Sequence, residues 1–221
     1  MFHKQTREVV EPQGQADPEP RWPGLLALLA VAALNWMLPP ELSGGPGWLT
    51  VAAIGVLAIL AHRLHRWHDV LGYLAAGIAT LSLAFAVTAL VRDLASHHGE
   101  PKQLLAGALL IWTMNVFVFA SWYWRLDAGG PHCRSHERVY CGGAFLFPQL
   151  TLPVEARKAI GAEDWRPRFI DYLFVAFNAS TAFSPTDVPV LSPWAKVLMM
   201  TQASISLTTL AIVAARAVNI L

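Results

Sequence analysis

Five long apolar runs, separated by short polar or Pro/Gly-rich breaks, dominate the pattern along this chain. They cover residues 22–38, 48–64, 70–91, 104–124 and 194–217. A bilayer core of about 30 Å needs about 20 helical residues, so the third, fourth and fifth runs are long enough to span it. The first two runs are shorter. We expect them to form two tilted spans, the alternative being a helical hairpin packed against the bundle.

Two segments interrupt this series and differ from it in composition. Residues 125–167 are rich in Gly, Pro and charged residues without a strong period, which is typical of an ordered loop or small cap. Residues 168–181 combine aromatic and small residues in a run too short to span, which favours a re-entrant or interfacial helix. Irregular backbone in the turn that follows, residues 182–189, is tolerated at membrane depth only where protein or water surrounds it.

The pattern therefore predicts an all-α integral membrane protein with about five transmembrane helices plus a re-entrant pore-type helix and turn. A polar tail (1–21) precedes a three-helix membrane region (22–103) and a C-terminal region (104–221) that contains the short helix and the turn. Composition agrees, because only 14% of residues are charged and mean hydropathy is +0.43, whereas soluble domains carry about 25% charged residues. We expect a multi-pass protein of the cell (inner) membrane.

Charge and motifs exclude two broad classes of function. The net charge is +1, with no basic stripe or recognition motif, so nucleic acid is not an expected partner. The chain contains no nucleophile–base pair, Walker loop or pair of carboxylates, so we do not expect an enzyme.

The last apolar run carries polar residues at helical spacing. Gln202, Ser206 and Thr209 recur at i, i+4 and i+7, so they share one face of the helix. Lipid disfavours such a face. It is therefore expected either to line a pore or to form interhelical hydrogen bonds in a packed bundle, and the sequence leaves both alternatives open.

The C-terminal half resembles the pore module of tetrameric potassium channels. It has the same order of transmembrane helix (104–124), polar loop, short helix (168–181), Thr-to-Asp turn and transmembrane helix (194–217). Against the filter motif Thr-Thr-Val-Gly-Tyr-Gly-Asp, the aligned residues are Thr181, Ala182, Phe183, Ser184, Pro185, Thr186 and Asp187. The chain is also similar to a group of uncharacterised bacterial multi-pass membrane proteins that share Thr-Ala-Phe-Ser-Pro-Thr-Asp and the ending Ala-Ala-Arg-Ala-Val-Asn-Ile-Leu, and that group carries no known activity.

The departures from the filter motif change the expected chemistry. A potassium filter needs glycines to point successive carbonyls at the ion, whereas Pro185 fixes φ, removes a donor and has no glycine neighbour. The resemblance therefore implies an ion-conducting or ion-binding protein of pore-loop type that is not K⁺-selective, in a homo-oligomer, with a tetramer favoured. The alternative is a non-conducting membrane scaffold or partner subunit in which Ser-Pro-Thr-Asp is a structural turn, with Asp187 as a cap.

Membrane orientation stays open as well. The basic residues of loop 62–70 favour a cytoplasmic position for that loop and for residues 125–167, which lie on the same side. The resemblance to potassium channels implies the reverse orientation, with the polar loop outside.

A second candidate site lies in the polar loop. Four soft or imidazole ligands fall within ten residues: His132, Cys133, His136 and Cys141. Their density suits Zn²⁺, although the spacing matches no standard structural site. The two cysteines could instead close a disulfide loop on an oxidising face of the membrane, or remain unpaired. We expect no other cofactor.

Overall fold

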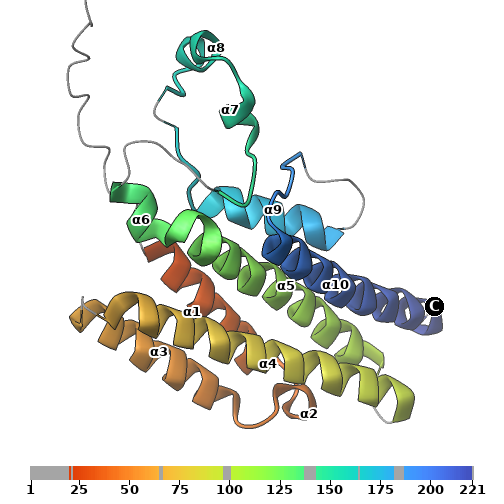
Figure 1. The fold of residues 1–221 in the computed structure, drawn as a ribbon. Helices are drawn as coiled ribbons and strands as arrows, with labels where there is room; N and C mark the ends of the chain where they lie inside the picture. The colour runs from red at the N-terminus through yellow and green to blue at the C-terminus, as the bar shows by residue number, and fades with distance from the viewer. Residues whose placement is uncertain are drawn as a thin grey trace, which may run out of the picture.

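The computed structural model describes residue 20 and residues 22–64, 67–96, 101–136, 143–163, 165–181 and 187–220. Regular structure within these ranges is helical, with one isolated antiparallel bridge that pairs Phe145 with Val190. The expectation of an all-α chain is confirmed for this part of the molecule. Figure 1 shows the helices gathered into an elongated bundle, with α7 and α8 standing out from one side.

Each predicted apolar run falls on one long helix of the bundle. These helices are α1 (Trp22–Met37), α3 (Gly47–Arg63), α4 (His68–Ser96), α5 (Pro101–Leu126) and α10 (Pro193–Ile220). The region predicted as a polar loop, 125–167, also contains short helices, which the pattern did not reveal. The short elements of the described chain are α2 (Pro40–Ser43), the 3-10 turn η2 (Asp127–Gly129), α6 (Gly130–His136), α7 (Pro148–Thr151), α8 (Val154–Ala159) and α9 (Phe169–Thr181).

Within the described ranges, three segments are long and apolar enough, by length and composition, to cross a membrane: His68–Asp93, Lys102–Gly129 and Pro193–Ala215. The helices α1 and α3 are apolar but shorter, at 16 and 17 residues. Helix breakers separate these two. Pro39 disfavours a helical conformation in the residue before it, and Gly44 takes the left-handed φ of 72° that glycine adopts without strain.

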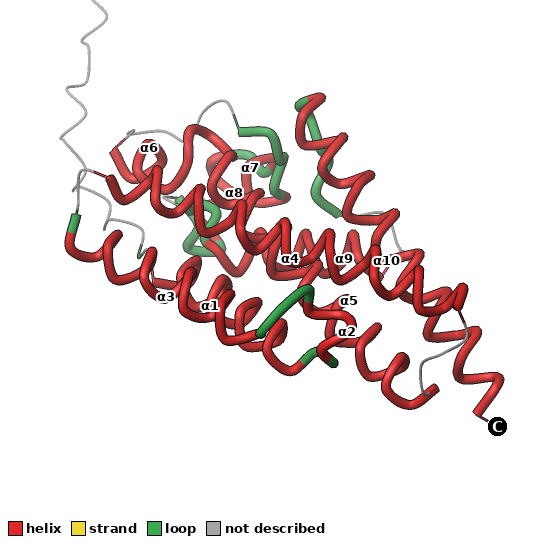
Figure 2. The backbone as a smooth tube through the Cα atoms, turned by 90° about the horizontal axis from the view of Figure 1, so that it is seen from below, coloured by secondary structure: helices red, strands yellow, loops and turns green. Residues whose placement is uncertain are grey.

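Long helices that follow one another in the chain run in opposite directions and share two ends. Figure 2 shows the bundle from below. At one end, which we call the α5 C-terminal end, the hydroxyl of Tyr73 in α4 donates a hydrogen bond to the carbonyl oxygen of Arg125 at 3.1 Å. At the opposite end, Leu42 of α2 packs against Gly107 near the start of α5. Residues 62–64 and 67–70 therefore lie at the same end of the bundle as Arg125.

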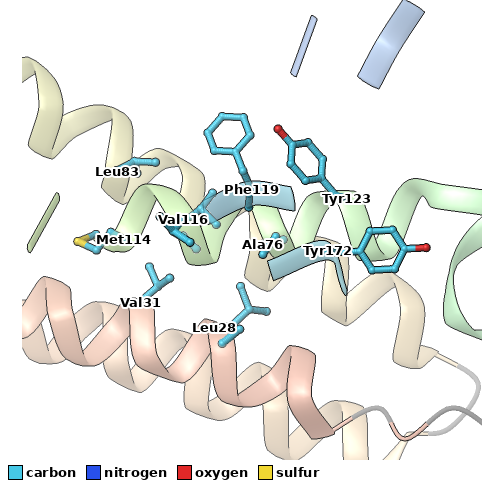
Figure 3. Close-up of a cluster of buried hydrophobic side chains, with 14 of the residues drawn as sticks. Leu28, Val31, Ala76, Leu83, Met114, Val116, Phe119, Tyr123 and Tyr172 are labelled. Atoms are coloured by element: carbon cyan, nitrogen blue, oxygen red, sulfur yellow. The ribbon is translucent and has the colours of Figure 1, made fainter. Parts of the chain in front are cut away.

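The helix α5 is the centre of the bundle and packs against α1, α4, α9 and α10. In Figure 1 it lies between α1, α3 and α4 on one side and α9 and α10 on the other. Figure 3 shows Leu28 and Val31 of α1 pointing toward the cluster that includes Met114 and Val116 of α5. The two predicted regions, 22–103 and 104–221, therefore share one hydrophobic core.

Replacing Gly24 of α1 with alanine is expected to destabilise the protein, because the added methyl group would overlap the buried ring of Trp124. Overpacking of this kind costs about 1–3 kcal/mol. The matched control is Gly77→Ala in α4, where an added Cβ meets nothing within 4 Å. Alanine is there favoured over glycine by about 0.5–1 kcal/mol. Thermal unfolding in detergent micelles compares the two, and equal stability of both variants would contradict the tight α1–α5 contact.

Candidate functional site

The short helix α9 packs against both α5 and α10 and reaches partway along the bundle. It begins at the α5 C-terminal end, where Phe169 meets Trp124 edge-on with ring centroids 5.8 Å apart. It ends near the middle of α5, where the indole N–H of Trp112 donates a hydrogen bond to the carbonyl oxygen of Ser180 at 3.2 Å. Twelve residues of α5 separate the two contacts, so α9 extends about 18 Å along the bundle at 1.5 Å per residue.

The next described segment after α9 lies again at the α5 C-terminal end. The backbone N–H of Leu191 donates a hydrogen bond to the carbonyl oxygen of Ala144 at 2.7 Å, beside the bridge between Phe145 and Val190. Phe145 packs against Tyr123 near the end of α5, with ring centroids 5.1 Å apart. The chain thus enters the bundle along α9 and is found afterwards at the end from which α9 started.

A buried polar cluster joins α9 to α10 and α5, with Gln202 of α10 at its centre. The Nε2 of Gln202 donates hydrogen bonds to the carbonyl oxygen of Ala176 at 2.7 Å and to Ser180 Oγ at 2.8 Å. Its Oε1 accepts a hydrogen bond from the hydroxyl of Tyr123 at 2.6 Å. All four residues are 0% exposed. Because a buried polar group needs a hydrogen-bond partner, these bonds fix α9 against both long helices.

Asn115 of α5 extends this cluster along α10. Its Nδ2 donates to Ser206 Oγ at 2.9 Å and to the carbonyl oxygen of Gln202 at 3.1 Å. Thr209 follows on the same face and donates to the carbonyl oxygen of Ser206 in its own helix at 2.9 Å. The predicted face of Gln202, Ser206 and Thr209 is therefore buried within the single chain, and Gln202 and Ser206 make interhelical hydrogen bonds.

The opposite face of α10 is left uncovered by the described part of the chain. Thr201, Ser204 and Thr208 are exposed on it, and each hydroxyl donates a hydrogen bond at 2.9 Å to the carbonyl oxygen four residues earlier. Val197 and Ala211 continue the same helical spacing and are exposed as well. We call these five residues the outer face of α10.

A second polar cluster closes the α5 C-terminal end. The carboxylate of Asp127, which is 0% exposed, accepts hydrogen bonds from the hydroxyl of Tyr172 at 2.6 Å and from the backbone N–H of Ala144. Arg134 donates to the carbonyl oxygens of Trp124 and Asp127 at 2.9 and 2.7 Å. Its guanidinium lies 5.1 Å from the ring centroid of Tyr172. These contacts anchor the start of α9 to the end of α5.

Most of the predicted pore-turn residues lie outside the part of the chain that the structure describes: Ala182, Phe183, Ser184, Pro185 and Thr186. Thr181 is half-buried, and its hydroxyl donates to the carbonyl oxygen of Asn178 at 3.0 Å. Asp187 is exposed and accepts no hydrogen bond from the described residues. Because α10 begins only at Pro193, Asp187 does not cap that helix.

The candidate metal ligands are only partly described. Cys133 of α6 is an exposed free thiol. The side chains of His132 and His136, and all of Cys141, lie outside the described residues. Elsewhere in the described ranges, no group of three or more His, Cys, Asp or Glu is placed to hold a metal ion. The Zn²⁺ site therefore stays a prediction.

Several members of the two polar clusters gave no signal in the sequence. Tyr123 and Ser180 lie in apolar or small-residue runs, and Asp127 reads as the start of a loop. Asn115 and Gln202 did give a signal, because amide side chains within runs of spanning length need partners.

Comparison of the chain with protein-family models, with curated proteins and with solved structures found no match.

Replacing Gln202 with leucine is expected to cost about 1–3 kcal/mol of stability, because the hydroxyls of Tyr123 and Ser180 lose their buried partner. The matched control is Thr201→Val on the exposed face, whose effect should stay within about 0.5 kcal/mol. Adding Tyr123→Phe to Gln202→Leu should cost less than the sum of the two single changes, since both remove one bond. Strictly additive effects in a detergent-unfolding series would show that this bond contributes nothing.

Proposed function

We propose that this chain is an ion-conducting or ion-binding membrane protein of the pore-loop type, that it is not selective for K⁺, and that it acts as a homo-oligomer, with a tetramer favoured. The observation that supports this best is the path of α9. It reaches the middle of α5, and the next described segment lies again at the end where α9 began. A short helix held in this way between two long antiparallel helices resembles a pore-loop module.

In this proposal α1, α3, α4, α5 and α10 span the cell (inner) membrane, and α9 is re-entrant. The shorter helices α1 and α3 are accommodated by local thinning of the bilayer and by interfacial anchoring of their ends. The C-terminal end of α9, at Ser180 and Thr181, then lies near the bilayer centre. A helix C-terminus carries partial negative charge, which favours a cation there.

The outer face of α10 is the proposed lining of the ion pathway. Thr201, Ser204 and Thr208 bring hydroxyl groups to the surface of a helix of spanning length. Between neighbouring copies, α9 would contribute an apolar contact through Ile170, exposed at 64%, and Phe174, exposed at 53%. Several copies arranged with the outer face of α10 inward would enclose a hydroxyl-lined, uncharged passage.

The alternative is a non-conducting membrane scaffold or partner subunit. One observation favours it specifically: the hydroxyls of Thr201, Ser204 and Thr208 already donate to their own helix. Hydroxyls satisfied in this way can face lipid or another helix without water. Ion flux is the property that separates the two proposals.

Purified protein in liposomes is expected to pass monovalent cations with little preference between K⁺ and Na⁺, because Pro185 and its neighbours lack the glycines that permit a ladder of carbonyls. Fluorescence-detected flux of each ion under matched gradients measures this. Strong K⁺ selectivity would overturn the proposed selectivity, and absence of flux for every tested ion would favour the scaffold.

Cysteine modification assigns that flux to the outer face of α10. In a background with Cys133 and Cys141 replaced by serine, a water-soluble thiol reagent is expected to modify Thr208→Cys and to reduce flux. The matched control is Thr209→Cys, one residue later on the buried face, which should not react. Equal responses of both variants would place the pathway elsewhere.

Asp187→Asn separates a role in conduction from a role in folding. Because the carboxylate is exposed and accepts no hydrogen bond from the described residues, stability should change by less than about 0.5 kcal/mol. If several copies of Asp187 form a ring at the pathway, loss of the charge should reduce cation flux. Glu155→Gln, which removes an equal exposed charge from α8, is the control. Parent-like flux in the Asp187→Asn protein would exclude such a ring.

A further inference from the structure

Arg125, in the last turn of α5, is a buried cation whose guanidinium pairs with no group in the part of the chain that the structure describes. It is 5% exposed, and its guanidinium makes no hydrogen bond or ion pair among the described residues. Its Nε is buried and unpaired. A buried charge without a partner is strongly unfavourable, and ionisable residues in membrane-spanning segments are normally paired. The residue therefore points to a negatively charged group from outside the described part of the chain.

The guanidinium is held at the junction of α4 and α5. It lies 5.4 Å from the ring centroid of Trp124 and packs against Gly72 of α4. A Cβ atom at Gly72 would collide with Nη1 of Arg125, so glycine leaves the space that the guanidinium occupies. The hydrogen bond from Tyr73 to the carbonyl oxygen of Arg125 holds the two helices together at this level.

Neither Asp69 nor Asp127, two described carboxylates at this end of the bundle, forms an ion pair with Arg125. Asp69, in the first turn of α4, acts on it electrostatically but is exposed and forms no ion pair. Asp127 is close in sequence, but its carboxylate accepts hydrogen bonds from Tyr172 and from Ala144. Among the described residues, no side chain therefore occupies the guanidinium N–H groups, and they can bind a ligand.

The surroundings of Arg125 are those of the headgroup layer. Trp22 and Trp67, exposed at 61% and 55%, lie at the same end of the bundle, as does the exposed Arg63. Aromatic and basic residues at helix ends are typical of the membrane interface and attract anionic lipids. The start of α4 lies at this end too, and a helix N-terminus favours negative charge. Phosphate is the anion that phospholipids present at this depth.

We propose that Arg125 binds a phosphate group, supplied by an anionic phospholipid headgroup, at the junction of α4 and α5. The planar fork of a guanidinium matches phosphate through two parallel N–H···O hydrogen bonds. A bound headgroup neutralises the buried charge and adds a link between α4 and α5. The site does not involve α9 or α10, so the proposal that it binds phosphate does not depend on ion conduction.

Native mass spectrometry of the full chain, delipidated in dodecyl maltoside without phosphate buffer, tests the site. Phosphatidylglycerol is expected to occupy one tight position, and phosphatidylcholine to bind more weakly. Arg125→Met keeps the apolar stem and should weaken the binding of phosphatidylglycerol at that tight position about tenfold or more. This is the loss expected for hydrogen bonds to a charged group. Gly72→Ala, which displaces the guanidinium, should have the same effect, and Arg125→Lys, which loses the fork, an intermediate one.

The matched control is Arg63→Gln, which removes an exposed charge at the same end. It should leave the affinity for phosphatidylglycerol at the tight position unchanged. Equal losses in the Arg63→Gln and Arg125→Met proteins would show diffuse charge attraction and overturn the site. Gly72→Ala and Arg125→Lys keep the cation, so they test the site even where Arg125→Met folds poorly. Tight binding that survives both of these changes would also overturn it.

Two further measurements distinguish the source of the negative group. If inorganic phosphate raises the Tm of the delipidated parent but not of Arg125→Met, and phosphatidylglycerol does not bind, the phosphate site stands and its ligand is soluble. Asp69→Asn should leave phosphatidylglycerol binding unchanged. If Asp69→Asn and Arg125→Met lower the Tm equally and neither alters lipid binding, Arg125 pairs with Asp69 and the proposal is wrong.

Discussion

The hydrogen bonds of Gln202 are the interaction on which the C-terminal half depends. One amide side chain bonds Ala176 and Ser180 of α9 and Tyr123 of α5, all within the buried interior. All of these residues are 0% exposed, so leaving their polar groups unpaired would be costly. The helix α9 has only 13 residues, too few to span a bilayer, so its position has to be fixed by specific contacts. Its depth in the bundle therefore follows from this cluster and from the anchor at Asp127.

The hydrophobic pattern was sufficient to predict the long helices, because runs of spanning length leave little conformational choice. Pro39 and Gly44 marked the break between α1 and α3, because the backbone preferences of proline and glycine interrupt a helix locally. The short helices within residues 125–167 were not predictable, since elements of four to seven residues show no periodicity. Of these, α6 depends on a tertiary contact: Arg134 donates to carbonyl oxygens at the end of α5.

The candidate site shows a different limit. Helical spacing predicted that Gln202 and Ser206 share a face. It could not decide whether that face packs against another helix or lines a pore, because this depends on which residues lie across from it in the fold. Asn115 lies opposite, 91 residues away from Ser206 in sequence. An equally polar face, with Thr201 and Ser204, remains uncovered on the other side. The burial of Arg125 was not predicted for a similar reason, since its sequence position suggested the start of an ordered loop or small cap and only packing against Gly72 revealed its burial.

The long sequence separation inside the polar cluster has a consequence for biosynthesis. Asn115 is translated 87 residues before Gln202, the residue whose carbonyl oxygen it binds. At roughly 5–20 residues per second, about 4–17 seconds separate the synthesis of these two residues. During that interval its amide and the hydroxyl of Tyr123 are without their native partners. The native hydrogen bonds of the cluster can therefore form only after α10 has been synthesised.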